Sequence, residues 1–439
     1  MLIPMLIIII LGINIKIIFA VFALTFFSLL AINFYILRIL VVLAIFFFFK
    51  IIALQVSVLL VFPLMVAFVI SFKNIDFPKI KNPVGKYFIL YFLLTLPSLF
   101  NATVPLLNTI QLMNLIAFFL FINVIYYSTN NLKDLYKLLG IFLFFLVIDS
   151  LYIFWLGLSS GDRVFGYTKV YFVDLAGIGI IISLLMFLIK ENQKYIHGIA
   201  SASITIALLL TQTRNTWIVV VLTLLISLFY LYRNAHSISI SKRKLLAFLF
   251  GAAILVIAMV VILKGYSSGI EDRVTDLSST DTQSSNSRIY LPSNSIVSRF
   301  FIWDTAILGF LKHPFIGIGV YGFPYQSKEY YEIPEYLFDI YVKGLDPHHG
   351  YLGVLVETGL IGFSGLILFL ISVIRNAYQN IKLSRSKDEI SLSIVLFFSF
   401  VYIVISLNFT HAWFWGQNMM LFSLLIGLST AHHKILSSK

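Results

Sequence analysis

Long apolar stretches separated by short polar connections repeat along almost the whole 439-residue chain. A stretch of about 20 apolar residues is long enough to cross the hydrocarbon core of a bilayer as a helix. The first apolar run, residues 1–72, predicts three or four crossings, and further stretches follow it. These cover 87–104, 105–127, 134–157, 170–190, 195–212, 215–232, 245–264, 351–374, 391–409 and 415–431. The pattern predicts an all-α polytopic integral membrane protein with about 12–14 transmembrane helices.

The composition favours the same class. Hydrophobic residues make up 60% of the chain and charged residues 11%, whereas soluble domains carry about 25% charged residues. The absence of cysteine excludes a disulfide framework and thiolate metal sites. The net charge of +12 is explained by basic cytoplasmic loops, so it does not indicate a nucleic-acid partner.

The polar connections divide into two groups of different charge. Stepping through the predicted helices puts the basic connections on one side, which the excess of Lys and Arg makes cytoplasmic. These connections are 73–86, 190–194, 233–244, 375–387 and the tail 432–439. The long segment 265–350 falls on the opposite side and has six Lys and Arg residues against ten Asp and Glu residues. We therefore expect a large external loop at 265–350.

This loop divides the chain into three predicted units. The first unit is an N-terminal transmembrane bundle, 1–264, and the second is the loop domain, 265–350. The third, 351–439, holds the last transmembrane helices and a cytoplasmic tail. Within the loop, 297–311 and 330–342 are predicted to be short amphipathic helices, the first lying on the outer leaflet. The apolar residues at helical spacing in the first are Phe300, Trp303, Ile307 and Leu311.

Several ionisable residues fall at the predicted external face, where a location near hydrocarbon is costly and usually functional. Arginine presents a planar fork that matches phosphate oxygens, and histidine titrates near neutral pH. The residues are Arg163, Arg214, Arg299, His348, His349 and Glu357. Together they indicate a site for a lipid-linked phosphate or diphosphate, with an imidazole that deprotonates an attacking hydroxyl. No acidic cluster accompanies them, so we expect no metal ion and no other cofactor.

Each of these residues also has a structural interpretation. The guanidinium of Arg214 either binds an anion or extends to water, and the pair His348 and His349 is either functional or structural. Arg163 is either a solvated loop residue or part of the site, and Arg299 either binds substrate or anchors its helix to lipid phosphates. Glu357 is either catalytic or the partner of an arginine. The glycines of 359–365 indicate close helix packing.

Three motifs, in order, resemble the O-antigen ligase/polymerase family of bacterial polysaccharide enzymes. They are the arginine turn "TRNTW", then "SRFFIWDTAILGFLKHPFIGIGVYGF", then "HHGYLGVLVETGLIG". The resemblance implies a GT-C-like fold, a diphosphate-binding Arg214 assisted by Arg299, and a catalytic His348. His349 stands where the family usually has Asn, which leaves open which ring acts. The segment around Arg163 resembles the family less closely, since its Pro-Asn pair is absent.

The resemblance implies a metal-independent glycosyltransferase in the bacterial inner membrane, with its site facing the periplasm. Its donor would be an oligosaccharide on undecaprenyl diphosphate, and its partners would include the bilayer and a chain-length regulator or other assembly proteins. A polymerase would use a second lipid-linked glycan as acceptor, and a ligase would use lipid A–core or protein. We favour the polymerase. The alternative from another class is a transporter or flippase of lipid-linked sugars, which would place its ionisable groups near the midplane instead.

Overall fold

The computed structural model describes residues 82–160, 172–190, 193–211, 213–238, 295–410 and 416–439, together with Ser241 and Leu245. These residues form helices joined by turns and loops, with no strand among them. The helices before the loop are α5 (Gly85–Thr95), η3 (Leu96–Asn101), α6 (Pro105–Ser128), α7 (Leu132–Ser160), α8 (Phe172–Ile189), α9 (Lys194–Leu210), α10 (Arg214–Arg233) and α11 (Ala235–Ile238). The later ones are α14 (Ser295–Lys312), α15 (Phe323–Gln326), η4 (Ser327–Glu329), α16 (Glu335–Tyr341), α17 (Gly350–Leu383), α18 (Lys387–Ser406) and α19 (Gly416–Ser437).

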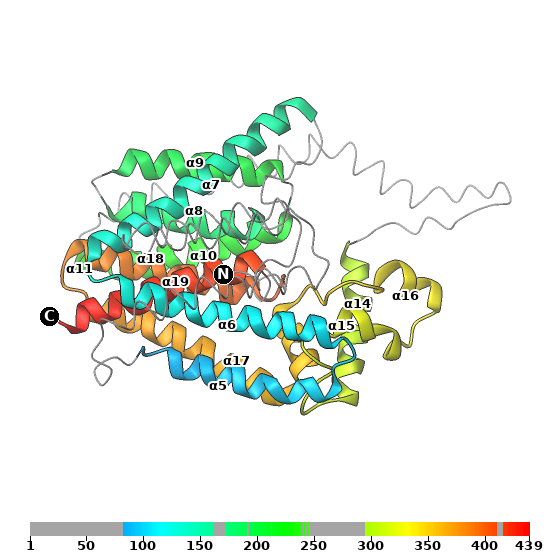
Figure 1. Cartoon of the computed structure of the whole chain (residues 1–439). Helices are drawn as coiled ribbons and strands as arrows, with labels where there is room; N and C mark the ends of the chain where they lie inside the picture. The colour runs from blue at the N-terminus through cyan, green and yellow to red at the C-terminus, as the bar shows by residue number, and fades with distance from the viewer. Residues whose placement is uncertain are drawn as a thin grey trace, which may run out of the picture.

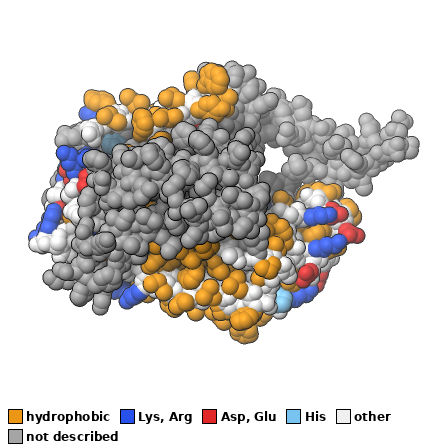
Figure 2. Space-filling view, viewed as in Figure 1, with side chains coloured by type: hydrophobic (Ala, Val, Ile, Leu, Met, Phe, Trp, Pro, Cys, Tyr) orange, Lys and Arg blue, Asp and Glu red, His pale blue; other side chains and the backbone are white. Residues whose placement is uncertain are grey.

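Six of the described helices are long and apolar enough to span a membrane. They are α6, α7, α8, α10, α17 and α18. They run alongside α5, α9 and α19 as one bundle (Figure 1). Where the described residues are visible, apolar side chains cover the flank of the bundle, and charged side chains gather at its two ends (Figure 2). This distribution is that of a polytopic membrane protein, as the sequence predicts. The predicted crossings in 1–72 and 245–264 lie outside the described residues.

The two ends of the bundle differ in the chain segments that they carry. One end carries residues 295–349, with α14 and α16 side by side, on the right in Figure 1; we call it the loop end. The other carries the connections around Lys190 and Arg385 and the end of α19, and we call it the basic end. The described basic connections thus lie together, opposite the loop, as the predicted helix order requires.

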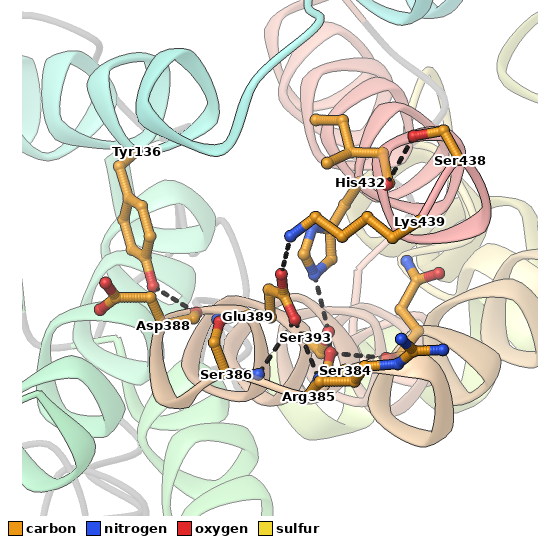
Figure 3. A network of polar contacts seen from close by, with 12 residues as sticks. Tyr136, Ser384, Arg385, Ser386, Asp388, Glu389, Ser393, His432, Ser438 and Lys439 are labelled. Carbon is orange, nitrogen blue, oxygen red and sulfur yellow. Dashed lines mark hydrogen bonds and ion pairs between the residues drawn. The ribbon is translucent and has the colours of Figure 1, made fainter.

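A polar network holds the helices at the basic end (Figure 3). Tyr136 of α7 donates a hydrogen bond to the carbonyl of Asp388 at 2.7 Å. Ser386 and Glu389 form a reciprocal capping box at the start of α18, which satisfies backbone N–H groups that the first helical turn leaves open. On the other side of this turn, Ser393 lies 2.9 Å from Nε2 of the buried His432 on α19. The network joins α7, α18 and α19.

Close packing between α5 and α17 depends on glycine. A Cβ atom on Gly365 would lie 3.0 Å from the Cα of Tyr91, which only a glycine avoids without a shift of the backbone. Gly362, one turn earlier, similarly lies near the backbone of Leu94. The close helix packing expected from these two glycines is therefore confirmed.

The loop end has a hydrophobic core of its own, separate from the large core of the bundle. Its buried residues are Ile302, Ala306, Ile318, Phe323, Tyr330, Phe338, Tyr341, Val342 and Val356. Val356 belongs to α17, so the first turns of that membrane-spanning helix form part of this second core. α14 and α16 confirm the two predicted helices in the loop.

The sequence predicts one apolar face on α14, and the structure shows a second apolar face that the prediction did not include. Phe300, Ile307 and Leu311 are exposed, whereas Ile302 and Ala306 are fully buried in the loop-end core. The helix therefore has two apolar faces. The 3.6-residue periodicity detects the more regular stripe and does not tell which stripe meets the protein.

Candidate functional site

The long helix α17 is broken near its start, and the break receives a loop. Gly359 has φ 63° and ψ −171°, a conformation that residues with a Cβ atom essentially never adopt. The break frees backbone groups on both sides. The carbonyls of Val356 and Glu357 accept from the N–H groups of Ile318 and Gly319 at 3.1 and 3.0 Å.

After the break, the N–H groups of α17 donate hydrogen bonds to the same loop. The N–H groups of Leu360 and Ile361 donate to the carbonyls of Pro314 and Phe315 at 2.8 and 3.1 Å. Residues 313–319 are thus bound to the broken turn by backbone hydrogen bonds on both sides. The two glycine-containing motifs, "HPFIGIG" and "ETGLIG", form one interlocked unit.

Glycine is required on both faces of this unit. A Cβ atom on Gly317, where φ is 70°, would lie 2.4 Å from the backbone carbon of Glu357. A Cβ atom on Gly359 would lie 2.3 Å from the backbone of Phe315. Helices outside this unit also hold the loop: Asn101 donates to the carbonyl of Gly317 at 2.7 Å, and Asn108 donates to that of Val320.

The histidine pair immediately precedes α17. Gly350 donates its N–H to the carbonyl of Leu407 at 2.6 Å, and a Cβ atom on Gly350 would collide with that leucine. His349 is the N-cap of α17, and its Nδ1 accepts the N–H of Leu352 at 3.2 Å. Burial lowers the pKa of His349, and the nearby charge of Arg299 acts in the same direction. Both effects favour the neutral form of His349.

His348 has different surroundings from its neighbour. Its Nδ1 lies 2.9 Å from Oδ1 of Asp346, and its backbone N–H donates to the same oxygen at 2.8 Å. The residue has φ 48°, in the left-handed region that is uncommon for residues other than glycine. Its side chain is 43% exposed, so the ring remains accessible to a ligand.

α14 lies against the segment that carries the two histidines. Trp303 donates its indole N–H to the carbonyl of Pro347 at 3.0 Å, and its ring meets that of His349 edge to face at 5.6 Å. Arg299 lies one helical turn before Trp303 and is half-buried. Burial lowers the pKa of Arg299, and the carboxylate of Asp346 opposes this shift. The Arg-x₃-Trp spacing thus directs both side chains towards residues 346–349.

Arg299 also meets the start of α10. With its amide oxygen turned towards the guanidinium, Asn215 accepts hydrogen bonds from Nη1 at 3.2 Å and Nη2 at 2.5 Å. This contact brings the first turn of α10, which begins at Arg214, next to α14. The side chain of Arg214 lies outside the described part of the structure, as does all of Arg163.

Glu357 lies at the broken turn of α17. It is 4% exposed, and its carboxylate accepts hydrogen bonds from the backbone of Tyr321 and Phe323. A buried carboxylate in this position binds the loop to the helix. Within the described residues, no group of three or more His, Asp or Glu side chains is arranged to hold a metal ion.

Two residues at this site were missed by the sequence analysis. Asp346 precedes His348 by two positions, a spacing at which an aspartate side chain can bond to backbone N–H in an Asx turn. Asn215 follows Arg214 directly, and nothing in the sequence shows that it would meet a helix more than 80 residues away.

The comparisons with known proteins match this part of the chain. The family model described as O-antigen ligase matches residues 198–370. We call residues 198–370 the O-antigen ligase region. No curated protein matches the chain.

The O-antigen ligase region contains the described elements that meet at the site: α10, α14–α16 and the first part of α17. The resemblance seen in the sequence motifs is thereby confirmed. The match supports a membrane glycosyltransferase of the O-antigen ligase/polymerase type. η3, α6 and α18 lie outside the matched region, yet they supply Asn101, Asn108 and Leu407, which fix the loop and the start of α17.

Proposed function

We propose that this protein transfers a glycan from undecaprenyl diphosphate to an acceptor hydroxyl at the external face of the bacterial inner membrane. The observation that carries the proposal is the meeting of three elements of the O-antigen ligase region. Asn215 at the start of α10 contacts Arg299 of α14. Trp303, also on α14, contacts Pro347 and His349, which precede α17. A guanidinium group and two imidazoles therefore lie together at one end of a membrane-spanning bundle.

The chemistry requires an anion site and a base. In the proposed reaction His348 takes the proton of the acceptor hydroxyl, whose oxygen attacks the anomeric carbon of the donor glycan. The bond between this carbon and the diphosphate oxygen breaks, and the lipid diphosphate leaves with the electron pair. Arg214 and Arg299 stabilise its developing negative charge, with Arg163 as a further candidate. No metal ion takes part in this scheme.

His349 and Glu357 receive supporting roles in this proposal. Nδ1 of His349 already accepts a hydrogen bond from Leu352, which favours His348 as the base. Glu357 holds the glycine loop against α17 and thereby fixes the start of that helix relative to the loop. We propose this positioning role in place of direct acid–base catalysis.

The identity of the acceptor separates two forms of this function. A polymerase adds the glycan to a second lipid-linked repeat unit, and we favour it, while a ligase adds it to lipid A–core or to protein. A transporter of lipid-linked sugars is the alternative without chemistry. The gathering of the candidate residues at one end of the bundle favours the enzyme, because transporters bind near the midplane.

The test is reconstitution of the protein in liposomes with an undecaprenyl-diphosphate glycan and one of the two acceptors. We expect release of undecaprenyl diphosphate by the wild type with the lipid-linked acceptor. Arg299→Ala and His348→Ala should each lower the rate by about a hundredfold, the usual scale for losing one oxyanion-binding group or the general base. Product formation is measured by mass spectrometry.

Arg375→Ala is the matched control, because this arginine lies on α17 near the basic end and is exposed. It should retain the wild-type rate. Transfer to lipid A–core alone would identify a ligase. Movement of intact donor across the bilayer without release of the diphosphate would contradict the enzymatic proposal and favour a transporter.

A further inference from the structure

Asp346 is the described acidic residue that contacts the proposed base. We infer that Asp346 is a positioning residue that fixes the tautomer of His348, so that Nε2 carries the lone pair that accepts the acceptor's proton. This inference rests on the proposed function for its catalytic meaning. Its structural content, the position of one proton on one ring, can be measured without any reaction.

The contact with Asp346 favours one tautomer. An ionised carboxylate has no proton to donate, so an unprotonated Nδ1 at 2.9 Å from Oδ1 of Asp346 would set two lone pairs against each other, and the proton is favoured on Nδ1 of His348. A neutral imidazole has one ring proton. Nε2 of His348 is then unprotonated and able to act as a base.

The same oxygen also fixes the direction of the ring. Oδ1 of Asp346 accepts the backbone N–H of His348 at 2.8 Å and lies 2.9 Å from Nδ1 of its ring. The backbone bond stabilises the unusual φ of 48°, and the contact with the ring limits rotation of the side chain. With 43% of its side chain exposed, His348 can present Nε2 to a ligand while Nδ1 stays next to Asp346.

His349 provides an internal comparison because its tautomer is the opposite. Its Nδ1 accepts a hydrogen bond from the N–H of Leu352, so this nitrogen is unprotonated and Nε2 carries the proton. A neutral His349 can donate a hydrogen bond from Nε2 and has no second lone pair with which to accept a proton. The inferred tautomers thus make His348 a proton acceptor and His349 a hydrogen-bond donor, so His348 is the ring suited to act as the base.

Asp346 also lies close enough to Arg299 to act on its charge. When His348 accepts a proton it becomes positive beside this guanidinium. A carboxylate next to both cations reduces their repulsion. Asp346 therefore stabilises the protonated form of His348 electrostatically, in addition to orienting the neutral ring.

Two variants separate the contributions of this residue. Asp346→Asn retains an oxygen that can accept both N–H groups but removes the negative charge, whereas Asp346→Ala removes both. We expect kcat for glycan transfer to fall about tenfold in D346N and about a hundredfold or more in D346A, with KM nearly unchanged. Asp339→Asn is the control, since this exposed carboxylate contacts only Lys343 among the described residues.

The direct readout is nitrogen NMR of the full-length protein labelled with ¹⁵N-histidine, in detergent at a pH where the rings are neutral, with resonances assigned by His348→Ala and His349→Ala. Wild-type His348 should show a protonated Nδ1 and an unprotonated Nε2, and His349 the reverse. In D346A the His348 pattern should shift towards protonation on Nε2 while His349 stays unchanged. A purely structural role for Asp346 would not move this signature.

Two results would overturn the inference. One is a wild-type His348 whose proton is on Nε2, and the other is a D346A variant that keeps its kcat while His348→Ala loses it. If the wild type transfers no glycan to either acceptor, the proposed function fails. The NMR pattern still decides the position of the proton.

Discussion

At the scale of single residues, the two adjacent histidines show how position determines chemistry. His349 caps the first turn of α17 through Nδ1, a task that the Asn side chain, usual at this position in the family, can perform with its amide oxygen. An Asn here can cap the helix in the same way, so the residue type differs from the family pattern without loss of the cap. His348, free of this task, is the ring that contacts Asp346.

The capping role predicts different effects of two substitutions on stability. His349→Asn should keep the free energy of unfolding within a few tenths of a kcal/mol, because Asn is a strong N-cap. His349→Ala should lower it by about 1 kcal/mol through loss of the cap. Thermal unfolding of the purified variants in detergent measures the difference. Equal stability of all three proteins would show that the cap contributes nothing.

The same cap predicts a dependence on pH. Burial lowers the pKa of His349 from its usual value of 6.5, so the folded protein favours the neutral ring. The stability gained is present above this value and is lost as the pH falls towards the lowered pKa, because protonation removes the accepting lone pair. His349→Asn should therefore be more stable than the wild type at pH 5 and equal to it at pH 8. A constant difference at the two pH values would contradict this assignment.

At the scale of elements, the site depends on the broken helix α17. Its backbone groups around Gly359 are bonded to residues 314–319, so the helix that crosses the membrane and the loop outside it move as one piece. Asn101 and Asn108 extend this attachment to η3 and α6. The start of α17, which the histidines immediately precede, is therefore held by the glycine loop, and through it by η3 and α6.

The broken turn makes a prediction about glycine. Gly359→Ala should lower the free energy of unfolding by about 1–3 kcal/mol from backbone strain alone, with a further loss from the collision with Phe315. Glycan transfer should fall with it, because the loop must shift. The matched control is Gly140→Ala in α7, where nothing lies within 4 Å of the new Cβ atom. This control should be neutral or stabilising by up to about 1 kcal/mol, since alanine favours helix.

At the scale of the whole molecule, the bundle separates charge and chemistry between its ends. The basic end carries the connections rich in Lys and Arg and the polar network of Figure 3, while the loop end carries the candidate site. The distribution of basic residues orients such a bundle with its basic end in the cytoplasm. On that basis we propose that the candidate site faces outward.

This orientation can be tested because the chain contains no cysteine. A cysteine at Lys343, exposed at the loop end, should react with a membrane-impermeant maleimide in intact spheroplasts. A cysteine at Lys382, exposed near the basic end, should react only after the membrane is permeabilised. The reverse pattern of labelling would place the loop in the cytoplasm and contradict the proposed location.

The sequence by itself determined the membrane-spanning class, the order of the helices, the grouping of the basic connections and the family. These properties follow from the lengths of apolar stretches and from short motifs, which are local. The tertiary structure alone decided that Asn215 meets Arg299, that α17 breaks to bind the glycine loop, and that the two histidines have different partners for Nδ1. Each depends on a contact between side chains or backbone groups in a specific orientation, some of them between residues as distant in the sequence as Asn101 and Gly317. Residue patterns do not encode the direction of a hydrogen bond.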